Sequence, residues 1–74
     1  MNEGDRKFCE KIGENLRRIM KEKNITQEEL SYRTGIAQPS ISRYLNGKTM
    51  PTVRPIHKIT RAIECTVDEL IGEE

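Results

Sequence analysis

The sequence predicts an all-α fold, a compact bundle of five short helices in which the second and third are joined by a very short turn. Three observations support this prediction. Apolar residues recur at three- and four-residue spacings, strand-like alternation appears nowhere, and capping residues and glycines punctuate the chain at short intervals. A chain of 74 residues has room for one core. We expect a flexible N-terminal arm at residues 1–5 and one folded domain at residues 6–72.

The first helix is expected over residues 6–23. Its apolar residues fall on one helical face and charged residues fill the other positions; the apolar residues are Phe8, Ile12, Leu16, Ile19 and Met20. Asn24 follows and can adopt the left-handed conformation that ends many helices.

The second and third helices are separated by an unusually short segment. Thr26 and Glu29 have the spacing of a capping box that opens the second helix, and Gly35 permits the positive φ that ends it. Only Ile36 and Ala37 then precede the third helix, expected over residues 38–46. Pro39 lies in its first turn, where the missing N–H costs no hydrogen bond.

Two further helices complete the predicted bundle. Thr52 can cap a fourth helix, whose inner face is formed by Ile56, Ile59 and Ile63. Thr66 and Glu69 repeat the capping-box spacing ahead of a short fifth helix that ends near Gly72.

Charge is unevenly distributed along the chain, although the net charge is only +1. Residues 1–29 hold seven acids and seven bases, and residues 64–74 hold five acids and no base. Residues 30–63 have no acid and six bases: Arg33, Arg43, Lys48, Arg54, Lys58 and Arg61. A basic middle of this kind is expected to attract a phosphate backbone.

Several functional classes are not supported by the sequence. No apolar run approaches the roughly 20 residues of a membrane span, and the N-terminus is polar, so a cytoplasmic protein is expected. Cys9, Cys65 and His57 match no metal-ligand spacing, and no nucleophile has a base and an orienting acid beside it. We therefore expect no metal, no cofactor, no small-molecule ligand and no enzymatic activity.

The outer face of the third helix has side chains suited to reading DNA bases. If Leu30 and Ile41 pack the second and third helices together, Gln38, Pro39, Ser42 and Arg43 remain on the uncovered side; we call these four residues the reading face. Glutamine can pair with adenine, arginine with guanine, and serine with several base edges.

These residues resemble the phage-repressor and Cro-type helix-turn-helix domains, the lambda-repressor-like family of transcriptional regulators. The resemblance covers about residues 12–72. Its markers are Ile25-Thr26-Gln27-Glu28-Glu29-Leu30, Gly35-Ile36, Ile41-Ser42-Arg43, Asn46-Gly47-Lys48, Pro51 and Thr66-Val67-Asp68-Glu69-Leu70. Ala37 departs from the pattern, because a serine or threonine commonly caps the third helix in this family.

The resemblance implies a role for each residue of the site. The third helix becomes the recognition helix in the major groove, and its reading face contacts bases. The residues implied to contact DNA phosphates are Gln27, Ser40, Asn46 and Lys48, with Gln27 also bracing Gln38. Val67, Asp68 and Glu69 are implied to form a two-fold contact between copies.

The expected function is therefore sequence-specific binding of double-stranded DNA as a bacterial or phage transcriptional regulator, a repressor that acts as a homodimer on a pseudo-palindromic operator. A different class stays open: a protein-interaction module, or the partner-binding domain of an antitoxin. Such a use would tolerate loss of the basic residues, whereas DNA binding needs them.

Overall fold

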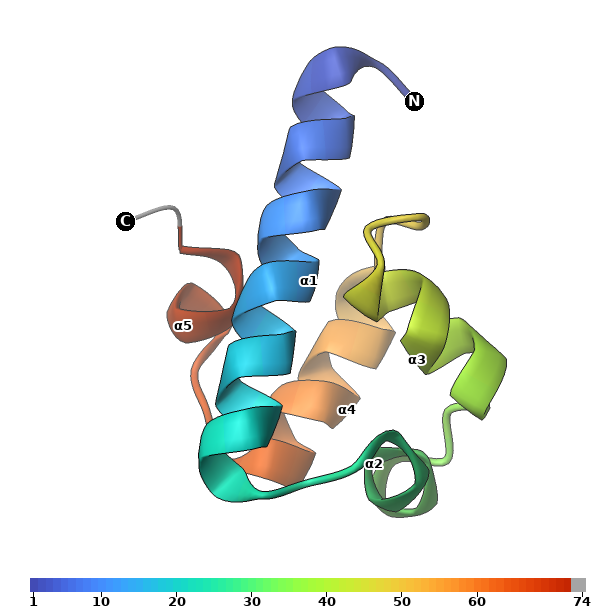
Figure 1. The fold of residues 1–74 in the computed structure, drawn as a ribbon, viewed down its shortest axis with the longest axis vertical. Coiled ribbons are helices and arrows are strands. Elements are labelled where there is room, and N and C mark those ends of the chain that lie inside the picture. Colours follow the sequence, from blue (N-terminus) through green and yellow to red (C-terminus); the bar gives the residue numbers. More distant parts are fainter. Residues whose placement is uncertain (73–74) are drawn as a thin grey trace.

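The computed structural model describes residues 1–72 and contains five α-helices in that range. They are α1 (Glu3–Lys23), α2 (Gln27–Thr34), α3 (Gln38–Leu45), α4 (Val53–Ile63) and α5 (Val67–Ile71). Figure 1 shows α1 running along the length of the molecule, with α5 on one side of it and α3 and α4 on the other. The predicted all-α bundle of five helices is confirmed. None of the helices in residues 1–72 is long and apolar enough to cross a membrane.

The core fills the space between α1 and the other four helices. Each helix contributes at least one buried apolar residue; the buried residues of this cluster are Ile12, Leu16, Ile19, Met20, Leu30, Ile41, Leu45, Ile59, Ile63 and Leu70. Asn15 is a buried polar residue, and its amide donates to the carbonyls of Leu70 at 2.8 Å and Gly72 at 2.9 Å. These bonds tie α5 to α1 by satisfying carbonyls that a short helix leaves unpaired.

The first helix begins at Glu3, three residues earlier than the predicted start at residue 6. The side chain of Asn2 accepts a hydrogen bond from the backbone N–H of Asp5 at 2.8 Å and so caps the helix. Glu3 and Asp5 place negative charge in the first turn, which favours a helix N-terminus. The capping signal at Asn2 was present in the sequence but lay ahead of the apolar stripe. The helix ends as predicted, with Asn24 in the left-handed conformation at φ 60°.

The two predicted capping boxes differ in the structure. At α5, Thr66 Oγ1 accepts from the N–H of Glu69 at 3.0 Å, and the Glu69 carboxylate accepts from the N–H of Thr66 at 2.8 Å. At α2 only the first bond forms, from the N–H of Glu29 to Thr26 Oγ1 at 3.1 Å. The Glu29 carboxylate instead pairs with Arg33 at 2.7 Å, one helical turn away. Residues four positions apart on a helix lie close enough to form an ion pair, so the spacing of Glu29 and Arg33 favours this contact.

Candidate nucleic-acid interface

The turn between α2 and α3 is fixed by side-chain hydrogen bonds. Gly35 adopts φ 77° at the end of α2. The hydroxyl of Ser31 donates to the carbonyl of Ile36 at 2.6 Å, and Thr34 Oγ1 accepts from the N–H of Ile36 at 3.0 Å. Leu30 and Ile41 are both fully buried, so each anchors its helix in the core. The sequence-based prediction assigned no hydrogen bond to the Ser31 hydroxyl, although Ser and Thr commonly stabilise turns in this way.

The reading face is accessible on α3. Ile41 and Leu45 point into the core, while Gln38, Pro39 and Arg43 are exposed. Ser42 is half-buried. The helix ends at Leu45, one residue before the predicted end, and Asn46 is its C-cap. The fold therefore brings the four predicted residues onto one short helix whose packing depends on other side chains.

The start of α3 lacks a side-chain cap. Ala37 is the N-cap residue, its backbone is extended at φ −61° and ψ 144°, and no side chain accepts a hydrogen bond from the first turn. Replacing Ala37 with serine is expected to stabilise the domain by about 1 kcal/mol, because a hydroxyl would accept one of the unpaired N–H groups. Urea denaturation followed by circular dichroism measures this change. Ala37→Val, which adds bulk without an acceptor, is the control and should give no such gain.

A polar chain links the end of α3 to α1. The Asn46 amide donates to Ser42 Oγ at 3.4 Å, and the guanidinium of Arg17 donates to Asn46 Oδ1 at 3.2 Å. Arg17 is exposed. The sequence-based prediction placed it among the charged residues that fill the other positions of the first helix. Nothing in the local pattern shows that α1 passes beside the end of α3. The fold thus adds a cation next to two predicted DNA contacts.

The remaining predicted phosphate contacts lie at the ends of α2 and α3. Gln27 is the first residue of α2 and is half-buried, Ser40 is half-buried in the first turn of α3, and Lys48 is exposed just after Gly47. N-terminal turns carry unpaired N–H groups and a partial positive charge, which suits phosphate oxygens. The contact by which Gln27 braces Gln38 stays a prediction.

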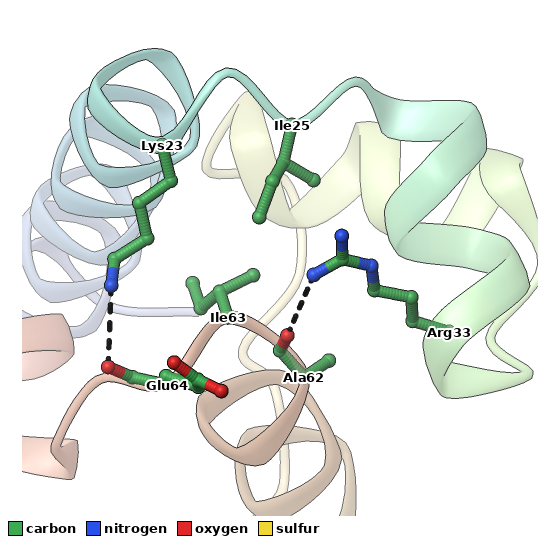
Figure 2. A pocket seen from close by; sticks show the side chains of 6 residues that line it. All are labelled: Lys23, Ile25, Arg33, Ala62, Ile63 and Glu64. Atoms are coloured by element: carbon green, nitrogen blue, oxygen red, sulfur yellow. Dashed lines mark hydrogen bonds between the residues drawn. The ribbon is translucent and has the colours of Figure 1, made fainter.

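The basic run does not lie on one surface. Arg33, Lys58 and Arg61 line a hollow between α2 and α4 together with His57, and no residue of α3 lines it. Figure 2 shows Arg33 and Lys23 at the end of α4, where Arg33 donates to the carbonyl of Ala62 at 3.1 Å and Lys23 to that of Glu64 at 3.3 Å. Cations there offset the negative end of the helix. Arg33, which the charge distribution placed in the basic region expected to attract DNA, therefore also stabilises the fold.

The residues predicted for the dimer contact lie on α5. Val67 is 45% exposed, and Asp68 and Glu69 are exposed beside it. Glu69 also serves the fold: the hydrogen bond from the backbone of Thr66 lowers the pKa of its carboxyl, with a smaller contribution from the charge of Lys23. The carboxylate is therefore ionised and held in the capping box at neutral pH.

Comparison with known proteins places this architecture among DNA-binding domains. Residues 15–73 match the Cro/C1-type HTH DNA-binding domain. The chain is 41% identical over 64 residues to an uncharacterised HTH-type transcriptional regulator of Coxiella burnetii, covering 85% of this chain and 30% of that protein. It is 37% identical over 62 residues to the cryptic phage CTXphi transcriptional repressor RstR of Vibrio cholerae, covering 84% of this chain and 55% of the repressor.

A solved structure shares the fold. The restriction-modification controller protein C.AhdI of Aeromonas hydrophila superposes with a TM-score of 0.80 at 24% sequence identity, over 84% of this chain and 94% of that one. At this identity the likeness concerns the fold alone. The resemblance inferred from the sequence is confirmed.

Proposed function

The chain belongs to the Cro/C1-type HTH DNA-binding domain family, and from that premise we propose that it binds a specific double-stranded DNA sequence as a transcriptional regulator. The observation that supports this proposal is the exposed outer face of α3, with Gln38 and Arg43 accessible while Ile41 and Leu45 anchor the helix. An α-helix fits the major groove of B-form DNA, where each base pair has a distinct pattern of donors and acceptors.

Two groups of residues, one on α3 and one around its ends, have separate roles in the proposed complex. Gln38, Ser42 and Arg43 contact base edges, and Pro39 contacts the groove through its ring. Gln27, Ser40, Asn46 and Lys48 bind phosphates, and Arg17 joins them through its hydrogen bond with Asn46. Phosphate contacts set the position of the helix, and base contacts determine which sequence is preferred.

Replacing Lys48 with alanine is expected to weaken binding to every DNA sequence by a similar factor. A lysine on a phosphate releases about one counterion, so the slope of log affinity against log salt should become shallower by about one unit. Titrations of a preferred and a scrambled duplex across a salt series measure both effects. A loss confined to the preferred duplex would contradict the phosphate role. Lys7→Ala, on the exposed first part of α1, removes the same charge elsewhere and serves as the control.

The proposed regulator acts as a homodimer and represses. One such module buries only about 600–1,000 Å² on DNA, so useful affinity generally requires two copies on half-sites one helical turn apart. The exposed Val67, Asp68 and Glu69 on α5 supply the proposed two-fold contact. The proposal of repression follows the likeness to the Vibrio phage repressor, of which this chain spans 55%.

Selection of bound duplexes from a random library tests the proposed function. The selection is run at about 50 mM salt and repeated near 200 mM, because phosphate contacts weaken as salt rises. Enrichment of a palindromic sequence is the expected result. A non-palindromic enriched sequence would contradict the dimer, and no enrichment at either salt would overturn the DNA proposal in favour of a protein-docking domain.

A further inference from the structure

Three sulfur atoms lie together where the first part of α1 meets the loop between α3 and α4. The Cys9 thiol is 3.4 Å from the thioether sulfur of Met1 and 3.8 Å from that of Met50. Cys9 is 1% exposed, Met50 is half-buried, and Met1 is 63% exposed. We call Met1, Cys9 and Met50 the sulfur cluster. It holds two of the three methionines and one of the two cysteines in the chain.

The separations of the Met1 and Met50 sulfurs from the Cys9 sulfur suit a three-coordinate metal ion. An ion with bonds of about 2.3 Å to three sulfurs in one plane separates the sulfurs by about 4.0 Å, if the bond length of zinc thiolates is taken as a guide. The two separations from the Cys9 sulfur are 3.4 Å and 3.8 Å, so the sulfurs of Met1 and Met50 need to move away from it by about 0.6 Å and about 0.2 Å. The exposure of Met1 leaves an entry route for the ion on that side.

The donor atoms determine which ion fits. Thiolate and thioether sulfurs are soft ligands that select Cu(I) over harder divalent ions. From this geometry and donor set, we propose that Met1, Cys9 and Met50 form a binding site for one monovalent soft metal ion of the Cu(I) class. No group of three or more His, Cys, Asp or Glu residues within the described chain is arranged to hold a metal. The sequence-based prediction considered only cysteine and histidine as ligands, and therefore did not include Met1 or Met50, which lies 41 positions from Cys9.

Binding of the metal ion displaces the proton of the Cys9 thiol. Cys9 carries a thiol, and a metal ion binds the thiolate form of cysteine. The ion forms a bond to the sulfur, the S–H bond breaks, and one proton passes to solvent; no electron is transferred. The carboxylates of Asp5 and Glu10 favour the incoming cation. The bound ion also links α1 to the loop that follows α3.

Titration with Cu(I) under anaerobic conditions, against a competing Cu(I) chelator, tests the site. The expected result is one ion per chain, one proton released, and a sulfur-only coordination shell of three atoms by X-ray absorption. Because ligand binding stabilises the folded state, free ion at 100 times Kd should raise Tm by roughly 10 °C or more. Zn(II) should give no comparable shift.

Variants separate the sulfur cluster from nonspecific thiol binding. Cys9→Ser should abolish the stoichiometric site, while Met50→Leu and a synthetic chain with norleucine at position 1 should each weaken Cu(I) binding at least tenfold. The matched controls are Cys65→Ser and Met20→Leu, which remove the other cysteine and the core methionine and should leave the affinity unchanged. Circular dichroism confirms that each variant is folded. Equal affinity in Met50→Leu, the norleucine chain and Met20→Leu, or loss of the site in Cys65→Ser, would overturn the proposal.

Discussion

Replacement of Gly13 with alanine is expected to lower the free energy of unfolding by about 1–3 kcal/mol. Alanine normally stabilises a helix interior by about 1 kcal/mol relative to glycine, but here α1 approaches the end of α3 too closely for a methyl group. An added Cβ would lie 2.5 Å from the carbonyl oxygen of Leu45 and 2.8 Å from that of Tyr44. Both neighbours are backbone atoms, so a helix must shift, and overpacking of this kind costs more than the propensity gain.

Gly4 in the same helix provides the matched control. A Cβ there meets only the side chain of Asn2, at 3.5 Å, so Gly4→Ala should be neutral or slightly stabilising. Thermal and urea denaturation of both variants measure the contrast. For a domain of this size, the Gly13→Ala change corresponds to a fall in Tm of roughly 5–20 °C. A Gly13→Ala protein as stable as Gly4→Ala would show that α1 and α3 are not in close contact.

The double replacement of Gln38 and Arg43 with alanine is expected to remove sequence preference while general affinity for DNA persists. A good side-chain contact to a base edge gives about 1–3 kcal/mol of discrimination, so losing two should reduce the ratio of preferred to scrambled affinity by a factor of roughly 30 or more. The phosphate contacts remain and continue to supply nonspecific binding. Fluorescence anisotropy with both duplexes at one salt concentration measures the ratio.

Arg61→Ala is the control for the charge removed with Arg43. Arg61 is exposed on α4 and lines the hollow between α2 and α4, away from the reading face. Its replacement should leave the affinity ratio unchanged. If the double variant keeps the wild-type ratio, α3 is not the reading element; if it binds no DNA at all, the division into base and phosphate contacts is wrong.

The helices were predictable because each leaves a local signal in the sequence. Asn24, Thr26, Gly35, Thr66 and Gly72 mark helix ends close to where the structure has them. The contacts that hold the helices together were not predictable in this way. Gly13 and Asn15 read as ordinary positions in α1, yet one permits close approach to α3 and the other binds the end of α5.

The residues of the candidate site also divide into those that the local sequence predicts and those that only the fold brings to the site. Residues of the reading face follow from the periodicity of α3 alone, and the structure places them on one helix. The local sequence pattern could not identify Arg17 as part of the site, because Arg17 lies 29 residues before Asn46 in the chain. Arg33, which belongs to the basic run, has a second role that the sequence did not predict, because its guanidinium donates to the carbonyl of Ala62 at the end of α4. The distribution of charge along the chain predicts an overall attraction to DNA phosphates. Only the fold shows which of the charged side chains also bind other parts of the protein.

The hydroxyls of Ser31 and Thr34 have an evolutionary consequence. They hold the turn, and Ile41 and Leu45 hold α3, with no need for the side chains of Gln38 or Arg43. Substitutions at exposed positions away from caps and partners usually change stability by less than about 0.5 kcal/mol. New operator preferences of the proposed regulator can therefore arise by exchange of a few surface residues in an unchanged scaffold.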